Sequence, residues 1–239
     1  ADTGIAAAKL RTRTYYDVSR GKGDEIADYG YNYANDGSTI KNTSVYYYNS
    51  LKASNATVTS ETTMNISESY KGSTILTANL RTKTYYDVSR GKGDEIADYS
   101  YNYDTTGAAV KTVSVFYYGG NRASNVAVTS DTAMNKSESY KTAALASINK
   151  LAGTSNLLSE TYYYVAAGKG EEVADYSYNY KLTTTTIKTT TQYLYGATFL
   201  TASGATTSDA MTRSDTYADT GIAAAKLRTR TYYDVSRGK

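Results

Sequence analysis

The sequence contains no cysteine, no histidine, no proline and no tryptophan. Without cysteine there are no disulfides and no thiol nucleophile, and without histidine the chain lacks the side chain that most often transfers protons near neutral pH. The aromatic residues are almost all of one kind, with 28 tyrosines against two phenylalanines. Because buried tyrosine hydroxyls need hydrogen-bond partners or water, this composition favours a shallow core, half covered by solvent, over a deep interior.

A large excess of one charge is also missing. The chain has 26 basic and 23 acidic residues, a net charge of +3, and the two signs are interleaved. Binding to nucleic acid requires basic residues concentrated on one face, so we expect no nucleic-acid partner. No apolar run approaches the roughly 18 residues that a transmembrane helix needs, so we expect no membrane span in this sequence.

The chain contains long and short sequence repeats. Residues 1–22 recur without change as residues 218–239, a period of 217 residues. A shorter unit of 70 or 77 residues begins at each of four leucines, Leu10, Leu80, Leu157 and Leu227. The predicted repeats are 10–79, 80–156 and 157–226, flanked by the tail of a preceding repeat at 1–9 and the start of the next at 227–239. Because tandem arrays of near-identical units are typical of fibres and stalks, we expect this sequence to be a stretch of a longer array.

Within each repeat, tyrosines alternate with small polar residues. In the segment 98–103, for example, every second residue is a tyrosine. This period of two predicts a strand with all of its tyrosines on one face. The predicted tyrosine ladder consists of Tyr29, Tyr31 and Tyr33, of Tyr99, Tyr101 and Tyr103, and of Tyr176, Tyr178 and Tyr180.

Further strands are predicted around this ladder strand. A strand at 10–18 precedes it, and the glycine-containing loop 19–25 connects the two as a β-hairpin. A β-branched and aromatic third strand follows at 39–48 or 110–118, and a fourth at 56–64 or 126–134. Alanine-rich pieces at 142–151 and 222–226 are compatible with short helices.

These elements predict an all-β fold, an elongated tandem-repeat antiparallel sheet array with units of about 70 residues. Each unit covers the exposed edge of its neighbour. The array is either solenoid-like or a broad sheet that spirals, and the sequence does not separate these two architectures.

Acidic residues recur in the first hairpin loop of each repeat and are the only candidates for a cation site. They are Asp24, Glu25, Asp94, Glu95, Glu171 and Glu172. Their spacing matches neither an EF-hand loop nor the calcium-binding nonapeptide repeat, so we favour solvated loops that keep a fibre soluble. We expect no enzymatic activity, no catalytic residue and no cofactor.

The segment Tyr16-Asp17-Val18-Ser19-Arg20-Gly21 and its copy starting at Tyr86 resemble the tyrosine–aspartate (YD, or Rhs-type) repeats of large bacterial surface and toxin-shell proteins. Together with the surrounding tyrosine-rich strands, the similarity covers about a third of each unit. Those repeats form long antiparallel sheets. The resemblance implies an extracellular structural role in a giant bacterial surface protein.

We therefore expect an extracellular or cell-surface structural protein that forms a filament, stalk or sheath and whose partner is itself, through neighbouring repeats or chains. An adhesin or glycan-binding rod, in which exposed tyrosines stack on cell-surface sugars, is the alternative. A second alternative is a self-assembling cross-β fibre subunit, because strands such as 114–118 lack charge and proline.

Overall fold

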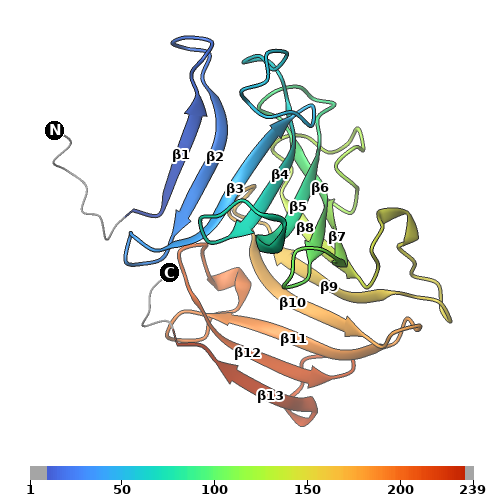
Figure 1. Ribbon diagram of the computed structural model, residues 1–239. Coiled ribbons are helices and arrows are strands. Elements are labelled where there is room, and N and C mark those ends of the chain that lie inside the picture. Colours follow the sequence, from blue (N-terminus) through green and yellow to red (C-terminus); the bar gives the residue numbers. More distant parts are fainter. Residues whose placement is uncertain (1–9, 235–239) are drawn as a thin grey trace. The chain divides into compact units, whose positions relative to one another are not determined.

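The computed structural model describes residues 10–234, which form thirteen β-strands and a few three-residue 3-10 turns. Within each of the two units described below, the strands lie in chain order and neighbouring strands pair antiparallel (Figure 1). The predicted all-β antiparallel fold is confirmed. The tail predicted at 1–9 lies outside the described residues.

The chain divides into two compact units, one ending at Lys111 and the other beginning at Thr112. In the first unit each strand pairs with the next in sequence, which makes an antiparallel meander. Its elements are β1 (Thr12–Asp17), β2 (Ile26–Tyr33), β3 (Ile40–Tyr48), β4 (Met64–Lys71), the 3-10 turn η2 (Thr77–Asn79), β5 (Leu80–Asp87) and β6 (Ile96–Tyr103).

The second unit has the same organisation, except that the first two residues of its strand β7 precede the division. Strands β7 to β13 again pair in order. The elements are β7 (Val110–Tyr118), β8 (Met134–Tyr140), η3 (Leu145–Ser147), β9 (Leu157–Tyr164), β10 (Val173–Tyr180), β11 (Ile187–Tyr195), η4 (Ala202–Gly204), β12 (Met211–Ala218), η5 (Ala224–Lys226) and β13 (Leu227–Tyr232).

Each predicted repeat contains four strands, but the prediction of the fourth strand is wrong. It was expected at 56–64 and 126–134, whereas β4 and β8 begin at Met64 and Met134. The segment before β4 is a loop closed by side chains: the Thr57 N–H donates to Asn55 Oδ1 at 3.0 Å and the Thr59 N–H to Thr62 Oγ1 at 2.9 Å. Such local bonds compete with a strand ladder for the same backbone donors.

This loop supplies part of the core. Ala53 and Val58 are fully buried and pack against Ile26 at the start of β2 and Tyr48 at the end of β3. In the second unit Ala202 packs in the same way against Val173 and Tyr195. Part of the interior therefore consists of small clusters formed where a loop folds back on two strands.

The true fourth strand is hard to recognise because one of its inward positions is charged. In β4 the buried residues are Ile66, Glu68 and Tyr70, which alternate with polar residues. Glutamate is depleted in strands and almost never fully buried without a partner, so the segment 64–71 does not look like a strand.

The predicted hairpin between the first two strands is confirmed, including the role of its glycines. β1 pairs with β2, and Gly21 and Gly23 in the connecting loop both have φ of 97°. Side chains with a Cβ rarely adopt this conformation. The alanine-rich segments expected to be short helices contain only the single 3-10 turns η3 and η5.

We predict that Gly107→Ala destabilises the protein more than Gly72→Ala. Both glycines have left-handed backbones, with φ of 68° and 70°, but a Cβ at Gly107 would lie 1.8 Å from the Thr77 carbonyl oxygen, whereas nothing lies within 4 Å of one at Gly72. The left-handed conformation alone costs about 1–2 kcal/mol, and the clash should add ~1–3 kcal/mol. Urea denaturation of both variants measures the difference, and equal midpoints would contradict the prediction.

Candidate functional site

A buried carboxylate lies in each strand pair that joins one predicted repeat to the next. These junction carboxylates are Glu68 in β4, Glu138 in β8 and Asp215 in β12, with 8%, 1% and 1% of their surface exposed. They occupy the second position of the recurring segments SESY, SESY and SDTY, at 67–70, 137–140 and 214–217. Burying a carboxylate is costly unless it is paired and hydrogen-bonded, so the surroundings of each one matter.

In the pair β4–β5, Glu68 lies opposite Lys83 and the Lys83 ammonium is 3.0 Å from Glu68 Oε1. The hydroxyls of Tyr47 and Tyr70 donate to Glu68 Oε2 at 2.7 and 2.6 Å. Burial alone would raise the pKa of Glu68, but the hydrogen bonds from Tyr70, Tyr47 and Lys83 hold it below its ordinary value. The carboxylate is thus fully charged and fully partnered.

In the pair β12–β13, Asp215 lies opposite Arg230. The guanidinium donates twice, from Nε to Oδ1 and from Nη2 to Oδ2, both at 2.9 Å, and Arg213 Nη2 lies 3.2 Å from Oδ2. Two-pronged bonding of this kind fixes geometry as well as charge. The hydrogen bonds from Arg230 lower the pKa of Asp215.

In the pair β8–β9 the corresponding cation is replaced by an acid. Glu138 lies opposite Glu160, which occupies the place of Lys83 and Arg230. Two lysines compensate: Lys136 Nζ lies 2.6 Å from Glu138 Oε1, and Lys150 Nζ donates both to Glu138 and, at 2.7 Å, to Glu160 Oε1. Like charges opposite each other would otherwise destabilise the pair.

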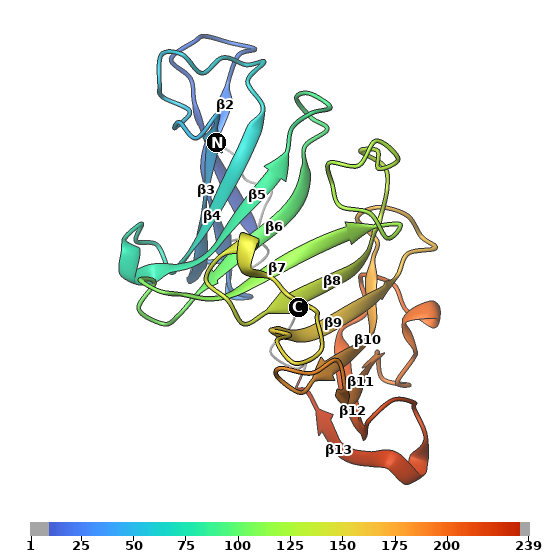
Figure 2. The same ribbon diagram turned by 90° about the vertical axis from the view of Figure 1, so that its right-hand side faces the viewer.

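Lys150 comes from the only one of the three connections that is longer. Leu157 follows Tyr140 by 17 positions, whereas Leu80 follows Tyr70 by 10 positions. The seven additional residues account for the 77-residue spacing. Figure 2 shows this connection between β8 and β9, which contains η3. The insertion and the Lys→Glu exchange therefore complement each other.

The insertion is held in place by its own hydrogen bonds. The Asn149 N–H donates to Asn156 Oδ1 at 2.8 Å, next to Lys150. Farther along, Ser155 and Thr183 form an isolated bridge between this segment and the turn after β10. Lys150 is thus positioned by a loop with two anchor points.

The predicted ladder tyrosines contact one another within each repeat. Ring centroids of Tyr29 and Tyr31 are 5.5 Å apart, those of Tyr99 and Tyr101 5.6 Å, and those of Tyr176 and Tyr178 5.2 Å. Each first member also stacks on a tyrosine of the preceding strand, Tyr15, Tyr85 or Tyr162, at 4.7–4.9 Å. The recurring YY pairs of the sequence mark these partners, but alternation within one strand does not assign them.

The last ladder tyrosines lie closer to the junctions. Tyr33 still contacts Tyr31, at 6.4 Å, while Tyr103 packs against the cluster of Val45, Tyr70 and Leu80. The Tyr180 hydroxyl donates to Glu160 Oε2 at 2.6 Å. Tyr180 therefore connects the ladder to the β8–β9 junction through Glu160.

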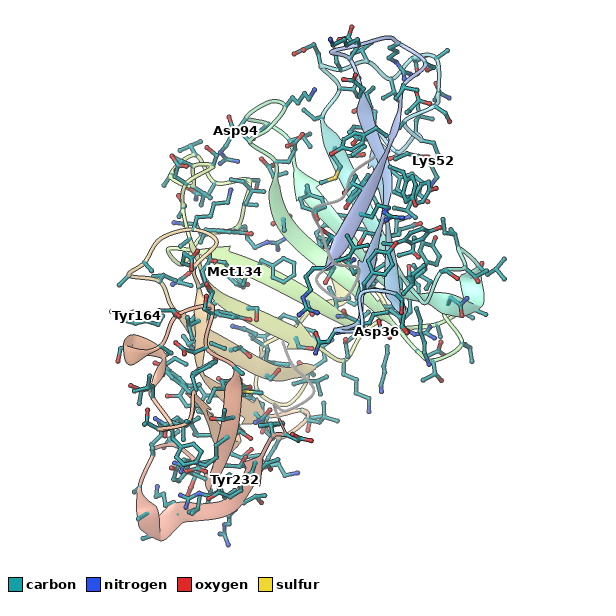
Figure 3. All side chains as sticks on the ribbon, turned by 90° about the vertical axis from the view of Figure 1, so that its left-hand side faces the viewer. Asp36, Lys52, Asp94, Met134, Tyr164 and Tyr232 are labelled. Carbon is teal, nitrogen blue, oxygen red and sulfur yellow. The ribbon has the colours of Figure 1, made fainter. Side chains whose placement is uncertain are left out.

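Most of the acidic loop residues accept hydrogen bonds from the protein's own backbone or side chains. Glu25, Glu95 and Glu172 each accept the N–H of a glycine two residues earlier. Glu95 and Glu172 also accept, at 3.0 and 3.1 Å, the N–H of Met64 and Met134, the first residues of β4 and β8. Of the others, Asp24 accepts from Ser60 and Glu171 from Thr207, and Figure 3 shows Asp94 on the loop between β5 and β6.

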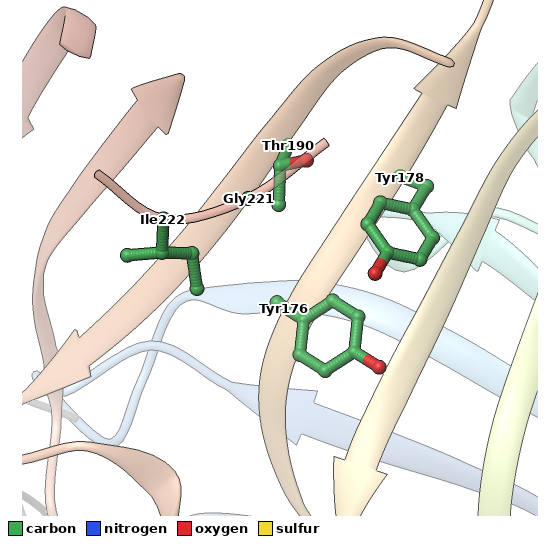
Figure 4. A pocket seen from close by; sticks show the side chains of 5 residues that line it. All are labelled: Tyr176, Tyr178, Thr190, Gly221 and Ile222. Atoms are coloured by element: carbon green, nitrogen blue, oxygen red, sulfur yellow. The ribbon is translucent and has the colours of Figure 1, made fainter. Parts of the chain in front are cut away.

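Within residues 10–234 no group of three or more histidine, cysteine, aspartate or glutamate side chains is placed to hold a metal ion. A surface hollow of about 280 Å³ in the second unit is lined by Tyr176, Tyr178, Thr190, Gly221 and Ile222 (Figure 4). The same described residues include no helix of the length and apolarity required to span a bilayer.

No protein-family model matches this chain, and no curated protein matches it in sequence. The junction carboxylates, the ladder and the loops therefore have to be interpreted from their own geometry. Every junction carboxylate is bound by at least one cation from the opposite strand or from the insertion, and Glu68 and Glu138 also accept from tyrosine hydroxyls. Such an arrangement suits a structural joint between strands.

We predict that Lys150→Met destabilises the protein at neutral pH and that the second change Glu160→Lys restores stability. The single variant leaves Glu138 and Glu160 facing each other, whereas the double variant recreates the Glu68–Lys83 arrangement. Removing one partner of a buried pair costs about 3–5 kcal/mol, and because the Lys150 side chain is 43% exposed we expect about 1–3 kcal/mol here. Chemical denaturation measures both effects.

The exposed Lys141, in the same connection, is the matched control. Lys141→Met should change the free energy of unfolding by less than about 0.5 kcal/mol. If Lys150→Met is no more destabilising than this control, or if Glu160→Lys fails to rescue it, Lys150 of the insertion does not compensate for the acid at position 160.

The junctions also set the pH range of stability. Burial would raise the pKa of Glu138, but hydrogen bonds from Lys136, Lys150 and Tyr140 lower it from 4.5 to about 2. Its stabilising contribution is therefore present above about pH 4.5 and lost as the pH falls toward 2. Burial and the hydrogen bond to Glu138 raise the pKa of Tyr117 from 10.0 to about 12, so its contribution is present below about pH 10 and lost as the pH rises toward 12.

We predict a stability plateau between roughly pH 5 and pH 10, with loss of stability on both sides. Denaturation midpoints across this range test the plateau, and tyrosinate absorbance tests its alkaline limit. The junction tyrosines should ionise together with unfolding. Their ionisation in a chain that is still folded would be evidence against the buried hydrogen bonds.

Proposed function

We propose that this chain is a structural β-repeat protein of an extracellular filament, stalk or sheath, and that it is one stretch of a tandem array with a 217-residue period. The observation that supports this most is the construction of the junctions. The last strand of one predicted repeat pairs with the first strand of the next around a buried ion pair. Strand pairing within the repeats is of the same antiparallel kind.

This construction suits an array because it removes sheet edges. A meander exposes an unpaired edge at each end, and exposed edges tend to pair with other chains. When one repeat follows another, each internal edge is covered, and the buried carboxylate opposite a cation favours one strand register over its neighbours. We infer an elongated array of such units.

The tyrosine ladder adds stiffness to each unit in this proposal. Stacked and edge-to-face tyrosines contribute roughly 0.5–1.5 kcal/mol per pair beyond burial. The resemblance to YD or Rhs-type repeats favours an extracellular setting on a bacterial surface. A scaffold held by ion pairs, tyrosine hydroxyls and ring contacts needs no cofactor.

A glycan-binding adhesin is the second candidate function. The hollow beside Tyr176 and Tyr178 favours it, since two neighbouring tyrosine rings can contact a sugar ring. Saturable binding on a glycan array that is lost in Tyr178→Ala would support the adhesin. A purely structural array gives no saturable binding.

We predict that proteins containing one, two and three tandem copies of residues 1–217 gain a constant increment of maximum dimension per copy. The junction Asp215–Arg230 then recurs inside the chain and keeps successive copies in register. Small-angle X-ray scattering measures the increments. Copies that tumble independently, with dimensions of a flexible chain of beads, would refute the proposed function.

The matched control is the same tandem protein with Asp215→Asn in one copy and Arg13→Met, the equivalent of Arg230, in the next copy at each internal junction. Weakened junctions should lower the mean maximum dimension and broaden its distribution. A distribution identical to that of the unaltered tandem protein would mean that the junction pair does not hold the copies in register.

A further inference from the structure

The sequence of strand β13 also occurs at β1, so the partner of β13 indicates what β1 can bind. Residues 10–22 and 227–239 are identical, so the described residues of β13 and β1 offer the same side chains. β13 pairs with β12, where Arg230 forms the two-pronged ion pair with the buried Asp215. The pair β12–β13 is therefore a template for what β1 can bind.

A second contact recurs in this template. The Tyr233 hydroxyl lies 3.0 Å from Ser214 Oγ. The corresponding pairs Ser67–Tyr86 and Ser137–Tyr163 have distances of 3.0 and 3.2 Å. At all three junctions, then, a tyrosine from the first strand of a repeat meets a serine from the last strand of the repeat before.

β1 carries the same groups without these partners. It pairs with β2 on one side, and no other strand of residues 10–234 pairs with its opposite edge. Arg13, the counterpart of Arg230, forms no ion pair with a carboxylate of those residues, and Tyr16, the counterpart of Tyr233, is 55% exposed. Among the described residues, this edge of β1 therefore offers the groups of a first strand at a junction without the last strand that binds them.

The hairpin of β1 offers a third contact. Glu95 and Glu172 accept the first N–H of β4 and β8. Glu25 occupies the same place in the β1–β2 loop, and Met211 occupies the place of Met64 and Met134 at the start of β12. A β1–β2 hairpin docked on β12 would thus bring Glu25 to the Met211 N–H.

We propose that the β1 edge of one molecule is a docking site for β12 of a second copy of this chain, in place of that copy's own β13. Arg13 pairs with Asp215, Tyr16 with Ser214, and Glu25 accepts from Met211. Because residues 10–22 and 227–239 are identical, the exchange conserves the strand pairing, and the Glu25 contact adds to it. This inference rests on the proposed structural role and specifies how two chains join end to end.

A labelled synthetic peptide with the sequence of residues 208–221, SDAMTRSDTYADTG, tests the edge directly on the protein of residues 1–239. Fluorescence anisotropy should show saturable binding. Arg13→Met in the protein, or Asp215→Asn in the peptide, should weaken binding by about tenfold or more, as expected for truncating one partner of a buried charge pair.

The control is Arg11→Met, which removes the same charge two residues away, where Arg11 donates to Asn35. It should bind the peptide as the unaltered protein does. Circular dichroism of all variants verifies folding. An absence of saturable binding, or equal affinity for Arg13→Met and Arg11→Met, would overturn the docking site.

Sedimentation of the full chain tests whether the occupant is a second copy. Refolding at high concentration should give end-to-end oligomers, more of them for Arg230→Met, which loosens β13, and none for Arg13→Met. A chain that binds the peptide but stays monomeric under all these conditions would overturn the second copy and assign the edge to a preceding segment of the same polypeptide. The tandem-copy scattering is independent of this result, so failure of the docking site leaves the proposed function standing, and the reverse also holds.

Discussion

The burial of a carboxylate between two β-strands is the interaction on which the rest of this structure depends. A charged group in a shallow tyrosine-rich core is tolerated only with a cation and hydrogen-bond donors around it. Lys83 and the hydroxyls of Tyr47 and Tyr70 meet this demand at Glu68, and Arg230 meets it at Asp215. Each junction thereby requires a particular partner strand in a particular register, which a purely apolar pair of edges would not do.

At the β8–β9 junction the residue opposite the buried carboxylate is itself acidic, so the positive charge has to come from elsewhere. With Glu160 in the position of the cation, the charge balance is restored by Lys136 and by Lys150 from the seven-residue insertion. The insertion is anchored by Asn149 and by the Ser155–Thr183 bridge, so the lysine reaches both acids from a fixed loop. Length variation among the repeats is therefore tied to electrostatics and is more than drift in a surface loop.

The tyrosines serve two purposes in this arrangement. Their rings fill the space that leucine and phenylalanine fill in other sheets, and their hydroxyls supply the donors that the buried carboxylates need. Tyr180 does both, since it belongs to the ladder and donates to Glu160. This dual use explains how a chain with two phenylalanines and no tryptophan builds an ordered sheet with only small apolar clusters.

The sequence by itself determined the strand-rich class, the four-strand pattern of the predicted repeats, the first hairpin with its two glycines, and the common face of the ladder tyrosines, because alternation and turn chemistry are local properties. It did not place the fourth strand at its true position, because the inward residue Glu68 looks like a surface residue until Lys83 is placed opposite it. Nor did it assign Lys150, ten residues from one acid and twelve from the other, because nothing local marks a lysine that completes a distant pair. Only the tertiary structure decided these contacts, since the energy of a buried charge depends on groups brought together by strand pairing.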